Sequence, residues 1–154
     1  MTRLALETAR ALVDDAKRHA VELGKALSIT VVDAGGYLIL SERMDGARPI
    51  TPSIALSKAY SAAVMERPTV MLEGWSKSDP VFFSQVARMG HQPIVATKGG
   101  YTLKLDGEIV GGVGISGGSP AEDQAICESI VAAAGFATDF PAWAGLAQGA
   151  TNHG

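Results

Sequence analysis

IVATKGGYTLKLDGEIVGGVGISGGSPAEDQAICESIVAAA, residues 94–134, carries the clearest structural signals in the chain. The runs 101–105 and 108–116 are rich in β-prone residues, and Asp106-Gly107 separates them. A two-residue Asp-Gly loop needs positive φ at both positions and is the strongest short-range signal of a hairpin. The stretch therefore predicts two antiparallel strands joined by a tight turn.

A helix start follows the second of these strands. Ser119 is the predicted N-cap, Pro120 the first helical residue, and Glu122 completes a capping box. The glycine-containing loop 117–119 could hold an anion on its free N–H groups, or it could be an ordinary capped turn. Glu122 and Asp123 in the first turn disfavour phosphate there, so a carboxylate or an edge of a larger ligand is the better candidate.

Three glycines, at positions 111, 112 and 114, interrupt the second strand. Glycine weakens a strand, so three of them indicate that something approaches this strand very closely. The sequence leaves two possibilities open, which are another segment of backbone and a bound ligand.

The composition limits the class of protein. The chain has 154 residues, 47% of them hydrophobic and 19% charged, which predicts a single domain, 1–154, with a real core. A net charge of −3 without a basic run argues against nucleic-acid binding, and no apolar stretch is long enough for a membrane span. The amphipathic N-terminus contains acidic residues and does not resemble a secretory signal, so we expect a cytoplasmic protein. One cysteine, Cys127, excludes an internal disulfide and is predicted to be buried.

The remaining pattern predicts an α+β fold. Because the four or five predicted strands occur mostly as hairpins, we expect a mainly antiparallel sheet with the first and last helices on one face. Thr51 is the predicted cap of the second helix, and the tail 140–154 is predicted to be an extension across a neighbour. The predicted elements are helices at 3–23, 51–66 and, as two short pieces, within 69–90, with strands at 27–32, 37–42, 94–97, 101–105 and 108–116.

Three motifs resemble one known family. They are VVDAGGYLILSERMDGA (31–47), LSKAYSA (56–62) and DGEIVGGVGISGGSPAEDQAI (106–126). In this order they are similar to the GlcG/HbpS family, which includes haem-degrading-protein-like members and the C-terminal domain of PduO-type proteins. The resemblance implies a five-stranded antiparallel sheet of profilin-like or GAF-like appearance. It also implies a homo-oligomer, often an octamer.

The resemblance further implies a possible haem or tetrapyrrole site. Some members bind haem through a histidine late in the first helix, and His19 matches that place. A threonine near the glycine pair contacts haem iron in one branch, and Thr102 is the nearest candidate here. Many members have a small residue where this chain has Tyr101, and the large ring is expected to reshape a pocket. From the residues alone, a surface histidine at a helix end is the simpler interpretation of His19.

A second hypothesis is a cofactor-free enzyme that transfers protons, as an isomerase, tautomerase or lyase does, on an oxygenated catabolite. Lys58 or Arg43 would hold an anionic oxygen, His91 or Asp33 would move a proton, and Tyr101 would donate to a carbonyl. Lys58 has a simpler interpretation as a solvated lysine that buries only its stem. The three histidines have no metal-ligand spacing, so no metal site is expected. The two hypotheses are therefore an oligomeric small-molecule-binding protein and a small-molecule enzyme.

Overall fold

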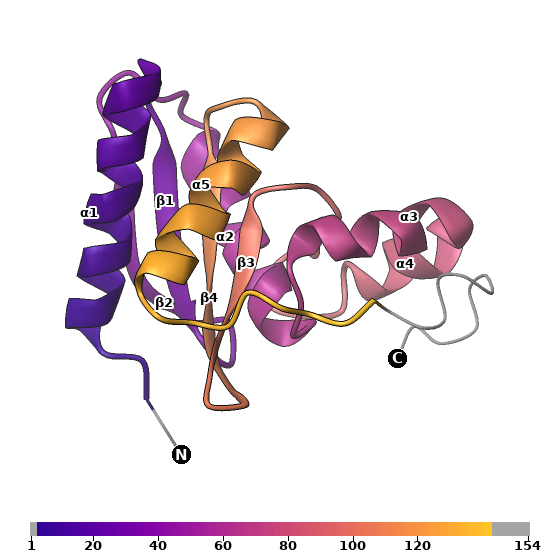
Figure 1. The fold of residues 1–154 in the computed structure, drawn as a ribbon. Coiled ribbons are helices and arrows are strands. Elements are labelled where there is room, and N and C mark those ends of the chain that lie inside the picture. Colours follow the sequence, from indigo (N-terminus) through magenta and orange to yellow (C-terminus); the bar gives the residue numbers. More distant parts are fainter. Residues whose placement is uncertain (1–2, 143–154) are drawn as a thin grey trace.

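The computed structural model describes residues 3–142 (Figure 1). These residues form six helical segments and four strands. The helical segments are α1 (Leu6–Leu23), α2 (Thr51–Val64), the 3-10 helix η1 (Thr69–Leu72), α3 (Glu73–Ser78), α4 (Pro80–Val86) and α5 (Pro120–Ala133). The strands are β1 (Ser28–Asp33), β2 (Leu38–Arg43), β3 (Gly100–Leu105) and β4 (Glu108–Ser116).

The strands form one sheet in the order β2-β1-β4-β3, and each neighbouring pair is antiparallel. The predicted α+β class and antiparallel sheet are confirmed, but the prediction of five strands is wrong. Residues 94–97 have no strand structure, because their backbone groups bond elsewhere. The Ile94 amide donates to the Ala87 carbonyl oxygen, and the Val95 amide donates to the Ser61 hydroxyl on α2. Because these amides are already bonded, they are not available for the hydrogen bonds of a sheet.

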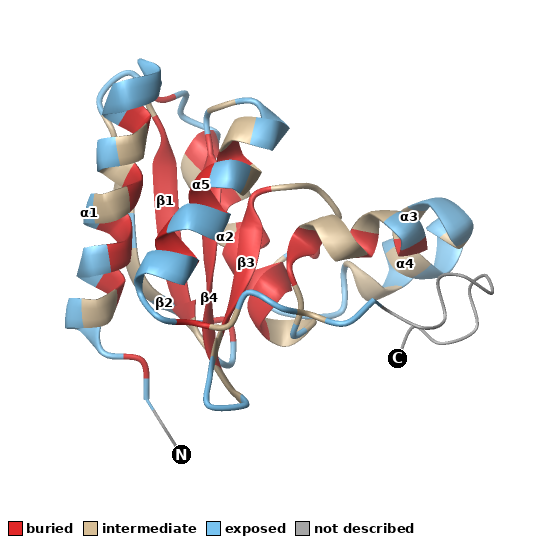
Figure 2. Ribbon diagram, viewed as in Figure 1, coloured by how far each residue is buried: buried red, intermediate tan, exposed pale blue. Residues whose placement is uncertain are grey.

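Helices cover both faces of the sheet (Figure 1). α1 and α5 lie side by side on one face, as predicted, and α2 lies on the other. The facing surfaces of all three layers are buried (Figure 2). The apolar stripe of α1 ends at Gly24, whose φ of 67° closes the helix in the left-handed conformation.

The glycines of β4 admit the backbone of α2. A Cβ at Gly112 would collide with the carbonyl oxygen of Ala59, and one at Gly114 would collide with that of Ala55. The small side chains on this face of α2 complete the close approach. Of the two possibilities left by the sequence, backbone contact accounts for these glycines, and no ligand is needed to explain them.

The local signals of the 94–134 stretch are confirmed. Asp106 and Gly107 have φ values of 52° and 79°, which the tight hairpin requires. The Ser119 hydroxyl accepts from the Glu122 amide at 3.1 Å, and the Glu122 carboxylate accepts from the Ser119 amide at 2.8 Å. This reciprocal pair is the predicted capping box.

The prediction that Thr51 caps α2 is wrong. Ile50 occupies the cap position, and no side chain caps the helix. The Thr51 hydroxyl lies 2.8 Å from the Ser28 hydroxyl and donates to the Arg48 carbonyl oxygen at 2.7 Å. The Thr51 hydroxyl therefore pairs with the buried Ser28 hydroxyl on β1 and does not cap the helix.

The segment η1–α3–α4 forms an arm at one side of the sheet (Figure 1). Trp75 is fully buried in it and meets the Phe83 ring at a centroid distance of 4.9 Å. The outer side of the arm keeps large apolar side chains exposed. These are Val81, Phe82 and Met89.

The chain after α5 runs back along β3. The Ala137 amide donates to the Lys104 carbonyl oxygen at 2.9 Å, and the Phe140 ring meets the Tyr101 ring edge-on. The described part of the tail therefore packs on its own sheet. Residues 143–154, the rest of the predicted extension, lie outside the described residues.

Candidate functional site

A hollow of about 350 Å³ lies between the last turns of α1 and the start of α5. We call it the His19 hollow. Its wall is mixed, with alanine and aliphatic side chains from α5 and two glutamates near its edge. The lining residues are His19, Glu22, Leu23, Ala121, Glu122, Ala125, Ile126 and Ser129.

His19 presents a free imidazole to this hollow. Its side chain is 35% exposed, and the nearest carboxylate oxygen, on Asp15, is 3.8 Å from Nε2. That distance is too long for a hydrogen bond, and none of residues 3–142 makes one to the His19 ring. An imidazole that is partly exposed and not hydrogen-bonded can coordinate a metal centre brought in by a ligand.

One ion pair marks the rim of the His19 hollow. Lys25 Nζ lies 3.8 Å from Glu122 Oε1, and both side chains are partly exposed. The Ser119 amide also donates to the Glu122 carboxylate and lowers its pKa below the ordinary value. Glu122 is therefore ionised at neutral pH, and Lys25 is the cation nearest to it.

Thr102 does not lie with His19. It is fully buried on the opposite face of the sheet, under α2, and its hydroxyl donates to the Ala62 carbonyl oxygen at 2.7 Å. The structure therefore does not bring the two candidate haem ligands together.

Asp33 and His91 lie in one corner, at the turn between β1 and β2. Asp33 Oδ1 accepts from the amides of Gly35 and Tyr37, at 2.9 and 3.0 Å. The His91 ring stacks on Tyr37 at 4.3 Å, and its Nε2 lies 3.0 Å from the Gly35 carbonyl oxygen. Asp33 Oδ1 and His91 Nε2 therefore hold the turn together.

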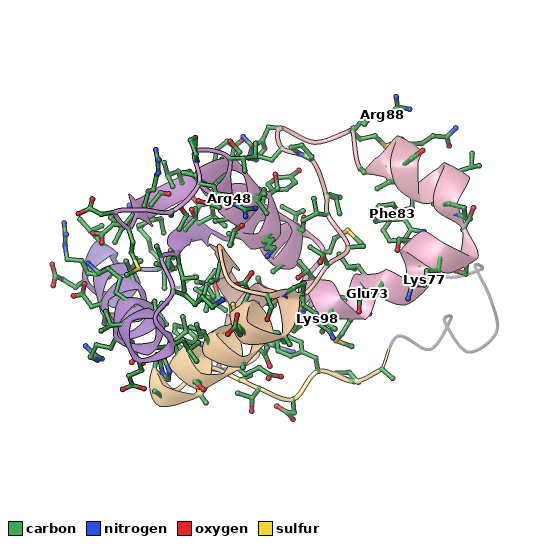
Figure 3. The ribbon with its side chains drawn as sticks, turned by 90° about the horizontal axis from the view of Figure 1, so that it is seen from above. Arg48, Glu73, Lys77, Phe83, Arg88 and Lys98 are labelled. Carbon is green, nitrogen blue, oxygen red and sulfur yellow. The ribbon has the colours of Figure 1, made fainter. Side chains whose placement is uncertain are left out.

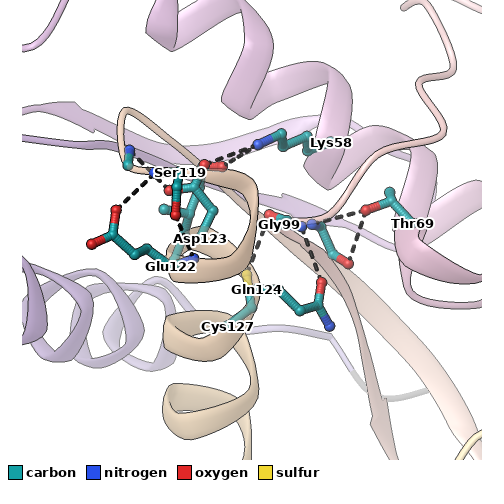
Figure 4. Close-up of polar contacts among 11 residues, drawn as sticks. Lys58, Thr69, Gly99, Ser119, Glu122, Asp123, Gln124 and Cys127 are labelled. Atoms are coloured by element: carbon teal, nitrogen blue, oxygen red, sulfur yellow. Dashed lines mark hydrogen bonds and ion pairs between the residues drawn. The ribbon is translucent and has the colours of Figure 1, made fainter.

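Lys58 is buried, so the expectation of a solvated lysine is wrong. Nζ donates to the Ile115 carbonyl oxygen at 2.7 Å and lies 3.3 Å from Asp123 Oδ2, with Asp123 Oδ1 accepting from the Gly118 amide (Figure 4). Burial raises the pKa of Asp123, against the opposing attraction of Lys58. The pair connects α2 to the first turn of α5.

Arg43 and Tyr101 lie apart from each other and from the other candidates. Arg43 is exposed at the end of β2, and its Nε donates to the Ala47 carbonyl oxygen at 3.0 Å. Tyr101 is buried in the core and donates to the Thr138 carbonyl oxygen at 3.1 Å, and burial raises its pKa. The five residues of the enzyme hypothesis thus occupy separate places, and only Asp33 and His91 are neighbours.

Sequence reasoning missed the partner of Lys58 and the wall of the His19 hollow. Asp123 could have been suspected, because an acidic residue in a first helical turn often serves as an anion for a nearby donor. The wall shows only as Ala121 and Ala125, a small-residue pair at helical spacing, which is a weak signal.

Two candidate site types find no support in the part of the chain that the structure describes. The anion loop before α5 is already occupied, because the amides of Gly118 and Ser119 donate to Asp123 and Glu122. Within residues 3–142, no three His, Cys, Asp or Glu side chains are grouped to hold a metal ion. The helices of the same range are each too short or too polar to cross a bilayer.

Comparisons with known proteins agree on one family. A model of the family described as "Haem degrading protein HbpS-like" matches residues 4–132. The corrinoid adenosyltransferase PduO of Citrobacter freundii is 32% identical over 130 residues, which cover 84% of this chain but 38% of PduO. A crystal structure of a PduOC:heme complex superposes with a TM-score of 0.79 at 29% identity, covering 89% of this chain and 99% of that one. A double mutant of Streptomyces reticuli HbpS gives a TM-score of 0.77 at 27% identity, covering 86% and 88%.

Proposed function

Because this chain belongs to the HbpS-like family, as its sequence motifs predicted, we propose that it binds haem or a related tetrapyrrole in the His19 hollow. His19 would be the axial ligand. The observation that carries the proposal is the free imidazole of His19 beside an apolar wall on α5. The crystal structure of the PduOC:heme complex supports it, because this fold can hold haem in a similar protein.

The residues of the hollow suit such a ligand. Leu23, Ala125 and Ile126 offer apolar surface to the flat ring, and small side chains at positions 121 and 125 leave room beside α5. Lys25 at the rim offers a cation to the ring's carboxylates. Bound haem would supply a redox-active iron, while the chain itself would orient the ring and shield one of its faces.

Two sequence expectations need restating at this site. Thr102 would contribute no ligand, because it is buried under α2 and bonded to Ala62. Tyr101, which was expected to reshape the pocket, lies in the core and does not line the His19 hollow. The departure from the family pattern at that position therefore does not weigh against haem here.

We also propose that the protein is a homo-oligomer, for which the family resemblance implies an even number such as eight. Exposed apolar side chains support this part of the proposal. Val21 is 71% exposed on α1, and Met89 is 72% exposed just after α4. Isolated exposed apolar residues are ordinary, but these belong to surfaces that a second copy could cover. Light scattering after size-exclusion chromatography measures the number of chains.

The haem proposal is tested by titrating haemin into the purified protein and following the Soret band. We expect a saturable, stoichiometric shift in the wild type and its loss in His19→Ala. Since His19 is a partly exposed helix residue without a hydrogen bond to residues 3–142, its removal should change stability by no more than about 0.5 kcal/mol. Loss of binding would then report on the ligand and not on the fold.

The matched control is His91→Ala, which removes the other described histidine. His91 is exposed and lies at the β1–β2 turn, so its variant should bind haemin as the wild type does. A titration without saturation would overturn the haem proposal. An unchanged Soret shift in His19→Ala would overturn the assignment of the ligand.

A further inference from the structure

A second hollow, of about 490 Å³, lies on the other side of the Lys25–Glu122 ion pair. We call it the Arg48 hollow. Its walls come from the end of α1, the segment before α2, the first turn of α2 and the β4–α5 loop. The lining residues are Gly24, Lys25, Ala26, Gly46, Ala47, Arg48, Ile50, Thr51, Ile54, Ser116, Gly117, Gly118 and Ser119.

Two of the family motifs meet at this hollow, at positions that the haem proposal does not use. Gly46 and Ala47 end the first motif, and the loop 116–119 lies within the third. Gly117 has a φ of 130°, and a Cβ on it would lie 2.5 Å from the Ala26 carbonyl oxygen and 3.1 Å from Leu27 Cα. The loop can therefore close on the end of α1 only with glycine at this position.

The charge of the lining is unbalanced. Arg48 and Lys25 line the hollow, and no Asp or Glu does, in a protein whose net charge is −3. Lys25 is partly neutralised by Glu122 at 3.8 Å. The Arg48 guanidinium, by contrast, has no hydrogen-bond or ion-pair partner among residues 3–142. Figure 3 shows Arg48 beside α2, well away from the arm that carries Lys77 and Arg88.

We propose that the Arg48 hollow binds a small organic monocarboxylate, with the Arg48 guanidinium holding the carboxylate. A planar guanidinium presents paired donors that match the two oxygens of a carboxylate. Ala26, Ala47 and Ile54 give the same hollow an apolar wall for a short aliphatic body. The size of the hollow also exceeds what a bare inorganic anion would fill.

A dianion fits less well than a monocarboxylate. The amides of Gly118 and Ser119, which would be the natural phosphate donors, already donate to Asp123 and Glu122. These two carboxylates stand directly behind the loop and would repel a second negative charge. One free guanidinium is then matched to one negative charge.

The experiment uses full-length protein labelled with 15N-glycine, with sodium butyrate as the probe and butanamide as its uncharged match. Of the 18 glycines, Gly24, Gly46, Gly117 and Gly118 line the hollow, whereas Gly107 lies at the far hairpin. We expect butyrate to shift amide resonances of lining glycines saturably and to leave Gly107 unchanged. Butanamide should cause no such shift.

Arg48→Gln should weaken butyrate binding about tenfold or more, since a hydrogen bond between charged groups is lost. Arg88→Gln makes the same change at an exposed position just after α4 and should leave binding unchanged. The proposal is overturned if butyrate shifts no lining glycine, if butanamide shifts them equally, or if Arg48→Gln binds as the wild type does. Stronger binding of inorganic phosphate at the same glycines would overturn the assignment of a monocarboxylate.

This inference goes beyond the haem proposal and fails separately from it. Arg48 does not line the His19 hollow, and His19 does not line the Arg48 hollow. Haemin binding in Arg48→Gln and butyrate binding in His19→Ala therefore distinguish the two sites. Each variant should lose its own ligand and keep the other.

Discussion

The buried ion pair between Lys58 and Asp123 gives the sharpest test of how this fold is held together. The side chains are 6% and 3% exposed, and they join α2 to α5 across the end of β4. Replacing Lys58 by methionine keeps most of the apolar stem and removes the charge. Asp123 would then remain buried without a positive partner, with the Gly118 amide still donating to its Oδ1.

The expected loss is large because of burial and not because of distance. Breaking a buried pair by removing one partner costs about 3–5 kcal/mol, since the other charge is left uncompensated. An exposed pair is worth about 0–1 kcal/mol. Lys17 and Glu42 provide the comparison, because their atoms are closer, at 2.7 Å, but the side chains are 36% and 33% exposed.

We therefore expect Lys58→Met to lower the free energy of unfolding by about 3–5 kcal/mol, and Lys17→Met by about 1 kcal/mol at most. Urea denaturation followed by far-UV circular dichroism, at one fixed protein concentration, measures both. The double variant Lys58→Met/Asp123→Leu should recover much of the loss, because it removes both charges. Equal losses in Lys58→Met and Lys17→Met, or a double variant no more stable than Lys58→Met, would refute the reasoning.

Four further predictions use the same denaturation assay or a simple chemical one. Gly114→Ala should lose at least about 1–3 kcal/mol, because the new methyl would collide with α2 backbone, whereas the methyl of Gly35→Ala meets side-chain atoms at 3.2 Å or more and should cost much less. In acid, Glu122→Gln should remove stability that the wild type has above pH 4.5 and loses as the pH falls, because the folded pKa of Glu122 is lowered. Asp123→Asn should remove the opposite slope, a stability lost as the pH rises from 3.8 through the raised folded pKa of Asp123. Cys127 should react with a thiol reagent only at the rate of unfolding, because complete burial raises its pKa and blocks access; fast reaction of the native protein would contradict this.

Local chemistry explains what could be predicted from the sequence. The Asp106-Gly107 turn and the capping box of Ser119 and Glu122 depend on residues within a few positions of one another. Each of these residues is specific for its backbone conformation, so no tertiary contact is needed to interpret it. The antiparallel arrangement then follows, because short loops can join only antiparallel strands.

The failed predictions all involve partners far away in the sequence. Thr51 has the residue type of a helix cap, but its hydroxyl instead lies 2.8 Å from the Ser28 hydroxyl, 23 positions away. Residues 94–97 look like a strand, but Ser61 takes one of their amides. Lys58 looks solvated, yet its partners Ile115 and Asp123 lie 57 and 65 positions away. Spacing within a segment carries no information on such partners.

The candidate site could be predicted from the sequence only in part. His19 was found through the family resemblance, since a single histidine on a helix is weak evidence by itself. Its apolar wall depends on how α1 and α5 pack together, which the stripes of the two helices predict only in outline. The residues of the enzyme hypothesis lie apart for the same reason, because they were chosen at motif ends without knowledge of which ends meet.

The glycines of β4 explain why the hollows lie where they do. Because Gly112 and Gly114 let the α2 backbone rest directly on the strand, no space for a ligand remains between α2 and the centre of the sheet. The other face is filled by α1 and α5 over a continuous core. Room is left where these helices begin or end, and the Lys25–Glu122 pair divides that room into an apolar hollow with an imidazole and a second hollow with a free guanidinium. The glycine-rich strand that first suggested a ligand thus acts indirectly, because it lets α2 lie directly on the sheet and leaves the two hollows at the ends of the helices.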